Sequence, residues 1–335
     1  MSTLRSRSII LLLSIGLVLG ATESAWSATG RTIDRGREQA GLIFQILASE
    51  LALARGDIGT AAATYLSVAR QTQDPGAARR ATELAIQARS PERAQEAAAI
   101  WQNVAPDDAE AQSTLDLLHV VLGENEKLIR SLNARRDRAI KEQRLDAFYE
   151  YLAGLASRAP SKSDGLRIFD SVSRPDQEKP NVAYTLAMMH EKAGQPQMME
   201  KILRGLIARD PQHAHAHNAL GYHFADRNER LGEAKALIER ALALAPNDAH
   251  IIDSMGWVYF RLGDLERAEQ YLRQAQRQLP DAEISTHLGE VLWSRGRREE
   301  AESMFRAAFG ADPSNEVLIN TLKRLGISPA RVHPR

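Results

Sequence analysis

The chain has 335 residues, of which 44% are hydrophobic and 5% aromatic, and its 43 basic and 43 acidic side chains give no net charge. A balanced chain offers no basic field that could hold nucleic acid or an anionic membrane surface. Cysteine is absent, which excludes disulfides, thiolate metal sites, a cysteine nucleophile and a lipidated N-terminal cysteine. The low aromatic content fits helices rich in alanine and leucine better than strands.

The first 27 residues have the pattern of a secretory signal peptide. Arg5 and Arg7 precede an apolar run of 13 residues from Ile9 to Ala21, and small residues stand before Ala28, where cleavage is expected. In a helix this run covers about 20 Å of a hydrocarbon layer about 30 Å thick, which favours cleavage over the alternative, a retained membrane anchor. The sequence therefore predicts a periplasmic or secreted protein that is not a lipoprotein.

The next part of the chain contains weaker repeats of helix pairs. Residues 28–40 are polar and are expected to form a flexible lead-in. Residues 41–107 contain two pairs, in which glycine at Gly56 and proline at Pro91 separate the helices. Residues 109–175 show a degenerate version of the same pattern. The segment 174–180 is rich in proline and charge, so it is the best candidate for a hinge.

The clearest pattern lies between residues 181 and 314, where four helix pairs follow one another. A small residue in each first helix and a proline after each second helix recur every 33 to 35 residues: Ala187, Gly221, Gly256, Gly289; Pro211, Pro246, Pro280, Pro313. Self-similarity at this period is typical of stacked helix pairs. Residues 315–326 are expected to form a capping helix, and residues 327–335 a disordered tail.

These four pairs resemble the tetratricopeptide repeat family. The best-formed unit carries that family's marks at Met255, Gly256, Tyr259, Ala268, Leu272, Ala275 and Pro280. Small side chains stand where two helices approach to about 8–10 Å. The resemblance implies an all-α fold, a right-handed superhelical solenoid of antiparallel helix pairs, and a function in binding other proteins.

A narrower resemblance concerns the segments 53–57 and 218–230, which look like parts of proteobacterial envelope repeat proteins. Among these is an outer-membrane lipoprotein that binds a carboxyl-terminal processing protease and presents murein hydrolases to it. The resemblance implies an adaptor whose partner is an envelope protease or a murein hydrolase. This chain departs from that type because it is shorter and has no cysteine to lipidate.

By resemblance to the repeat family, the first helices line a concave groove that holds a partner protein. The predicted groove residues are Tyr184, Met188, His215, Asn218, Tyr222, Asp226, His250, Asp253, Trp257, Phe260, Arg261, Thr286, Glu290 and Trp293. Amphipathic aromatic side chains are typical of protein-binding hot spots. For Trp257 and Trp293 the alternative is that the indole packs between helices as part of the core.

The sequence shows no sign of a cofactor, a metal site or an enzyme. Four histidines cluster at His213, His215, His217 and His223, but no His-Glu-x-x-His arrangement accompanies them, so we expect no metal. Phosphate loops, nucleophile elbows and kinase signatures are also missing. We therefore expect a non-enzymatic scaffold or adaptor that serves envelope assembly or regulated proteolysis.

Two alternative functions stay open at this stage. Glycan or murein binding would use Trp257, Phe260 and Trp293 as stacking surfaces for sugar rings. An enzyme would need polar side chains that converge in the groove; the candidates are Asp226, His250, Asp253 and Glu290. The partner, the pathway and the oligomeric state do not follow from the sequence.

Overall fold

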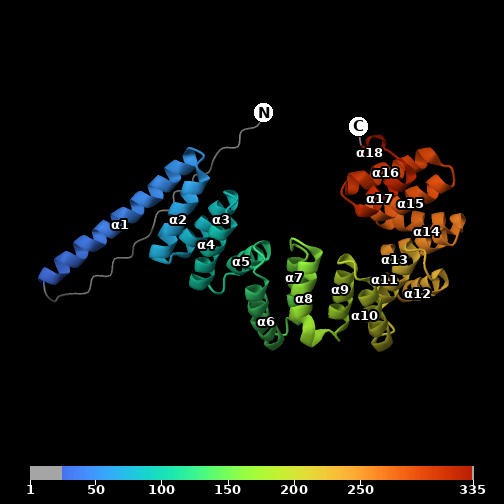
Figure 1. Ribbon diagram of the computed structural model, residues 1–335, viewed down its shortest axis with the longest axis horizontal. Helices are drawn as coiled ribbons and strands as arrows, with labels where there is room; N and C mark the ends of the chain where they lie inside the picture. The colour runs from blue at the N-terminus through green and yellow to red at the C-terminus, as the bar shows by residue number, and fades with distance from the viewer. Residues whose placement is uncertain (1–24, 334–335) are drawn as a thin grey trace. The chain divides into compact units, whose positions relative to one another are not determined.

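The structure is a computed structural model that describes residues 25–333, with side chains described from Arg37 onward (Figure 1). Most of the predicted signal peptide lies outside this range. The helices are α1 (Ala25–Ala54), α2 (Ile58–Thr72), α3 (Pro75–Gln87), α4 (Pro91–Val104), α5 (Ala109–Val121), α6 (Asn125–Lys141), α7 (Leu145–Ala156), α8 (Lys162–Ser173), η1 (Arg174–Asp176), α9 (Pro180–Lys192), α10 (Pro196–Arg209), α11 (Ala214–Asp226), α12 (Leu231–Leu244), α13 (Ala249–Arg261), α14 (Leu265–Gln278), α15 (Ala282–Ser294), α16 (Arg298–Ala311), α17 (Glu316–Leu325) and α18 (Pro329–Val332). Residues 25–333 contain no strand, which confirms the predicted all-α array of helix pairs.

The described chain divides within α5, after Leu118, into two compact units. In the first unit, α1 to α4 pack in sequence, and the core is built largely from alanines such as Ala61, Ala78, Ala94 and Ala97, which are fully buried. Side chains this small let neighbouring helix axes approach closely. No helix in residues 25–333 is both long enough and apolar enough to cross a membrane.

The second unit contains the four regular pairs α9/α10, α11/α12, α13/α14 and α15/α16 (Figure 1). Aspartates begin several of their helices, because a carboxylate at the N-cap accepts hydrogen bonds from free backbone N–H groups. The recurring glycine marks the point where the two helices of a pair touch. A Cβ added at Gly256 would lie 2.6 Å from Leu272 Cγ, and one at Gly289 would lie 2.6 Å from the Phe305 ring.

At its two ends the structure differs from the expected organisation. Residues 28–40 belong to α1 rather than to a flexible lead-in; they contain no proline, so nothing interrupts a helix that extends from the packed part of α1. In the expected disordered tail, residues 329–332 form α18. Ile327 and Val332 are buried there, and Arg331 binds Glu302 at 2.6 Å, so apolar contact and an ion pair hold this segment against the array.

The segment 174–180, the predicted candidate for a hinge, is held by polar contacts in the structure. Its Asp176 is buried and lies 2.6 Å from the Arg136 guanidinium on α6. The Tyr149 hydroxyl on α7 donates a second hydrogen bond to Asp176, at 2.7 Å. Burial and the neighbouring carboxylate raise the pKa of Tyr149, so the phenol stays a donor. These contacts fasten the segment to α6 and α7, because breaking them would leave the buried Asp176 carboxylate without its closest cationic partner.

Candidate protein-binding face of the second unit

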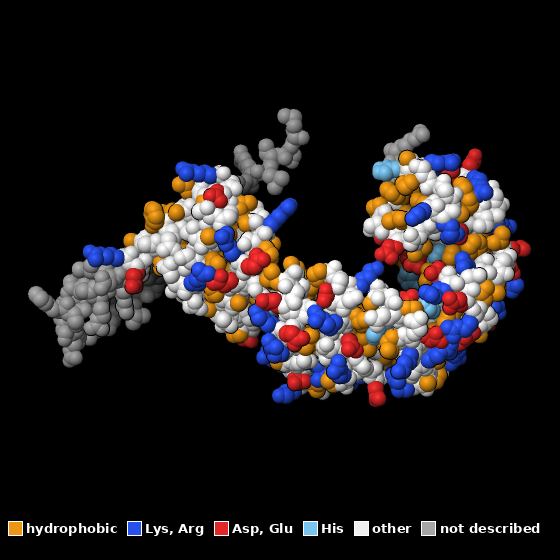
Figure 2. Space-filling model, viewed as in Figure 1, with side chains coloured by type: hydrophobic (Ala, Val, Ile, Leu, Met, Phe, Trp, Pro, Cys, Tyr) orange, Lys and Arg blue, Asp and Glu red, His pale blue; other side chains and the backbone are white. Residues whose placement is uncertain are grey.

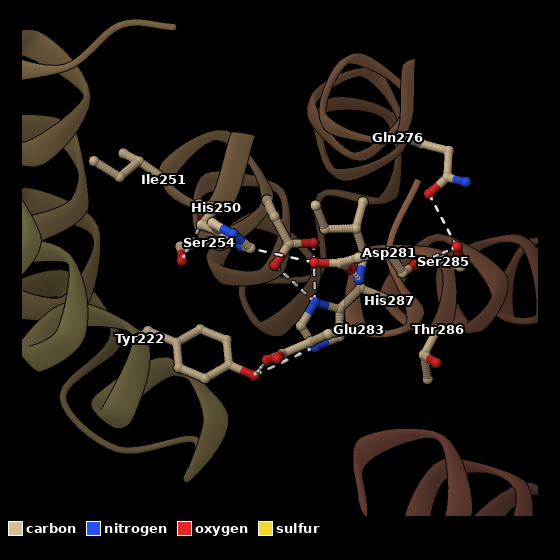
Figure 3. Close-up of polar contacts among 12 residues, drawn as sticks. Tyr222, His250, Ile251, Ser254, Gln276, Asp281, Glu283, Ser285, Thr286 and His287 are labelled. Carbon is tan, nitrogen blue, oxygen red and sulfur yellow. Dashed lines mark hydrogen bonds and ion pairs between the residues drawn. The ribbon is translucent and has the colours of Figure 1, made fainter. Parts of the chain in front are cut away.

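The first helices of the four regular pairs, α9, α11, α13 and α15, form the inner wall of the second unit. The decisive contact joins α11 to α15, which belong to pairs on either side of α13. The Tyr222 hydroxyl donates to Glu283 Oε1 at 2.7 Å and lies 3.4 Å from His287 Nε2 (Figure 3). A curved stack brings alternate pairs together only on its inner side, so these helices line the concave face.

A buried polar cluster lies beneath this wall. His287 is fully buried, and its Nδ1 lies 2.9 and 3.0 Å from the two carboxylate oxygens of Asp253 on α13. The indole of Trp257 stacks on the imidazole, with ring centroids 4.1 Å apart and planes 19° from parallel. The cluster thus ties α11, α13 and α15 together through hydrogen bonds and one stacked pair of rings.

The electrostatics of the cluster favour an ion pair. Burial alone disfavours a charged imidazole, but the charge and hydrogen bond of Asp253 outweigh that effect, and the pKa of His287 rises to about 9. Burial raises the pKa of Asp253, while His287 acts in the opposite direction. As an imidazolium, His287 donates from both ring nitrogens, so the Tyr222 oxygen accepts at Nε2 while the Tyr222 proton goes to Glu283.

A second buried carboxylate fastens the capping helix to the same wall. Glu290 on α15 is 2% exposed and accepts two hydrogen bonds from Arg324 on α17, at 2.6 and 2.7 Å. This bidentate arrangement is among the strongest that an arginine and a carboxylate can form. The capping helix predicted at residues 315–326 therefore joins the array by a specific ion pair as well as by apolar packing.

Four of the predicted groove residues are closed to solvent, which differs from expectation. Asp253, Trp257, Thr286 and Glu290 are 4%, 3%, 0% and 2% exposed. Asp253 and Trp257 pack against His287 on α15, Thr286 bonds to the Ala282 carbonyl oxygen, and Glu290 lies under Arg324 of α17. For Trp257 the structure therefore favours the alternative of core packing. These four residues stabilise the wall from within and do not contribute to its accessible surface.

The other predicted groove residues form the accessible part of the face. His215, Asp226 and His250 are exposed, and the half-buried members are Tyr184, Met188, Asn218, Tyr222, Phe260, Arg261 and Trp293. In Figure 2 the hollow of the second unit holds acidic and histidine side chains. The face is therefore aromatic, histidine-rich and mixed in charge.

The two exposed histidines repeat along this face. His215 Nδ1 lies 4.0 Å from Asp248, and His250 Nδ1 lies 3.8 Å from Asp281 (Figure 3). Each aspartate is the N-cap of the next first helix, so each histidine stands at the same place in successive repeats. The rim of the face thus presents similar polar pairs at the repeat spacing.

Within the described part of the chain, the four side chains named as candidates for an enzymatic site form no hydrogen bond or ion pair with one another. His250 lies near Asp281, whereas Asp253 bonds to His287 and Glu290 to Arg324. His287 itself is fully buried with both ring nitrogens engaged, so it has no open position for a substrate.

The clustered histidines have separate structural contacts. His213 Nδ1 accepts a hydrogen bond from the Ala216 N–H at the start of α11, at 3.1 Å. His217 Nε2 lies 3.2 Å from the Pro211 carbonyl oxygen, and His223 Nδ1 lies 3.1 Å from Glu191. Within residues 25–333 no three potential ligands come together as a metal site.

The sequence pattern did not single out His287 or Arg324 as members of these networks. A signal for His287 was available: the equivalent positions in the two preceding first helices hold Ala219 and Ser254. A large titratable side chain at a position that is otherwise small indicates a special environment.

Comparison with known proteins agrees with this architecture. Residues 184–249 and 254–316 match the family model of the tetratricopeptide repeat. This part of the chain is thus similar to tetratricopeptide repeats both in sequence and in the arrangement of its helix pairs. A tetratricopeptide repeat-containing protein of Pseudomonas aeruginosa is 44% identical over 145 residues, which are 43% of this chain and 25% of the relative. The chain thus spans about a quarter of that relative's length.

Solved tetratricopeptide repeat proteins resemble the chain more distantly. One from Thermus thermophilus is 22% identical with a TM-score of 0.46, and the match covers 53% of this chain and all of that one. Another, from Parabacteroides merdae, is 13% identical with a TM-score of 0.45 and matches 84% of this chain and 97% of that one.

Proposed function

We propose that this protein is a non-enzymatic scaffold that binds another protein, or an extended segment of one, on the concave face of α9, α11, α13 and α15. The observation that carries the proposal is the position of partly exposed aromatic side chains on a wall that buried ion pairs hold rigid. Aromatic residues and arginine dominate protein-binding hot spots, and a preorganised surface loses little entropy when it binds.

The centre of this face is α13, where Phe260 and Arg261 lie at the C-terminal end of the helix. Phe260 packs against the buried Trp257 with ring centroids 5.1 Å apart, and the Arg261 guanidinium lies 5.7 Å from the same indole. A fixed indole therefore positions both side chains. This arrangement supports an apolar anchor flanked by polar contacts, which suits a peptide segment of mixed charge.

We further propose that the protein works in the bacterial envelope. The N-terminal pattern of Arg5, Arg7 and the apolar run before Ala28 supports export, and a chain without cysteine tolerates an oxidising compartment. The resemblance to envelope repeat adaptors supports a partner such as an envelope protease or a murein hydrolase. Recovery of a mature chain that begins at Ala28 from the periplasm tests the compartment.

Binding is tested by affinity capture of envelope proteins with purified wild-type and variant protein. A true partner is retained by the wild type and by the outer-surface control Arg306→Ala, whose side chain lies on α16. Retention should fall about ten-fold or more with Phe260→Ala, as is usual for a hot-spot residue. Equal retention by all three proteins contradicts the proposed face. Retention by purified murein without protein favours the glycan alternative instead.

A further inference from the structure

The first unit carries an apolar stripe that no described residue covers. On α1, the side chains of Ile43, Phe44, Leu47 and Leu51 are 59%, 72%, 63% and 52% exposed. These side chains do not form the core-facing side of α1, because the helix packs against its neighbours through a different apolar face. The stripe is therefore separate from the apolar face that α1 buries when the first unit folds.

The core side of α1 is well defined. Leu42 and Ile46 pack against the cluster around Val68, and Leu53 packs against the cluster around Ala61. In a helix, the residues of the exposed stripe lie on the opposite face. An end face of a repeat array that meets only water carries polar side chains, so exposed large apolar residues in a row indicate a contact surface.

The spacing of the stripe is that of a two-stranded coiled coil. Phe44, Leu47, Leu51 and Ala54 follow one another at intervals of three, four and three residues, which is the alternation of a and d positions in a heptad. Side chains with this spacing on one helix can pack against the same side chains of an identical helix. The stripe thus matches its own copy in shape and in polarity.

The charges beside the stripe specify how two copies would align. In this register Glu50 occupies position g, and Arg55 occupies the e position five residues later. In a parallel pair, position g of one helix meets the following e position of the other, so Glu50 faces Arg55 of the second copy on both sides.

Within the described part of the chain, Arg55 has no ion pair of its own, and Glu50 accepts one hydrogen bond, from the Tyr65 hydroxyl at 2.7 Å. A carboxylate has room for more than one donor. Both members of the predicted pair are thus available to a second copy.

We propose that two copies of this chain associate through α1 as a parallel helix pair. The stripe is short, so the interface is smaller than the standard of about 1,600 Å² and dissociation should be measurable at about micromolar concentration. The proposal is independent of the concave face, because α1 belongs to the first unit and the predicted groove lies in the second.

The first test is sedimentation velocity of the predicted mature chain, which begins at Ala28, over a range of about 1 to 100 µM, which brackets the expected dissociation constant. The wild type should shift from monomer to dimer as its concentration rises. Leu47→Lys should stay monomeric throughout and keep the far-ultraviolet circular dichroism of the wild type. A wild type that is monomeric at the highest concentration overturns the proposal and leaves the stripe to another occupant, such as a lipid surface.

The alignment is tested by exchanging charges. Glu50→Arg and Arg55→Glu should each weaken the dimer about ten-fold, because each creates two like-charged pairs. The combined variant should regain most of the wild-type affinity. Tyr65→Phe removes the internal hydrogen bond to Glu50 and serves as the control, with unchanged association expected. Failure of the combined variant to recover contradicts the parallel arrangement.

Discussion

The ion pair between His287 and Asp253 makes the stability of the second unit depend on pH above neutrality. The unfolded imidazole has a pKa of 6.5, and in the folded chain it rises to about 9. A raised pKa means that the folded state binds the proton more tightly. The contribution to stability is therefore complete below pH 6.5 and is lost as the pH rises through 9.

The size of the effect follows from the shift. Each pKa unit corresponds to about 1.4 kcal/mol, so the shift of His287 from 6.5 to about 9 represents about 3 kcal/mol of unfolding free energy. Full burial of both partners leaves little screening by solvent, so no large discount applies. This is a considerable fraction of the stability of an ordinary domain.

The assay compares the wild type with Asp253→Asn/His287→Gln, which replaces two titrating groups by two amides that can still hydrogen-bond. Unfolding in urea is followed by far-ultraviolet circular dichroism from pH 6.5 to 10. The advantage of the wild type over the double variant should shrink by about 3 kcal/mol across that range. A difference that stays constant to within about 1 kcal/mol would refute the buried ion pair.

Three further substitutions test the packing. Gly289→Ala should lower the free energy of unfolding by about 1–3 kcal/mol, because the new Cβ would lie 2.6 Å from the buried Phe305 ring. The control Gly310→Ala, whose Cβ would have nothing within 4 Å, should raise the free energy of unfolding by about 0.5–1 kcal/mol. Similar effects of the two substitutions would contradict the close approach of the helices at Gly289. Val332→Asp should detach α18, lower the unfolding free energy by about 2 kcal/mol and expose the tail to carboxypeptidase, and continued protection of the tail would count against that packing. Asp176→Ala should lower the free energy of unfolding by about 3 kcal/mol, because it removes the buried carboxylate that pairs with the largely buried Arg136 guanidinium. An unchanged melting temperature would contradict this.

The sequence pattern predicted the helix pairs well because repetition reports local geometry. Gly256 and Gly289 recur because only a hydrogen atom fits between the paired helices there, and the family model matches the same region. The C-terminal segment was harder to predict, because the burial of Ile327 and Val332 depends on contacts with helices distant in the sequence. The sequence of the short tail alone does not indicate those contacts.

The candidate site was predicted only in part. The pattern predicted Asp253 and Trp257 as groove residues, whereas the structure buries both. The pattern could not show that the stack curves tightly enough to bring Tyr222 onto α15, or that both residues pack against His287. Curvature is the sum of small rotations between repeats. The accessible surface therefore shifts to neighbours such as Phe260 and His250.

The central claim is that the concave face of the second unit holds a protein, and crosslinking in cells tests it most directly. A photoreactive amino acid at position 260 or 250 faces the proposed site, and one at position 306 on α16 serves as the outer-surface control. The account predicts that a common protein partner is caught from positions 260 and 250 and is absent from position 306. Capture of the same proteins from all three positions, or of none from the concave pair, would contradict it.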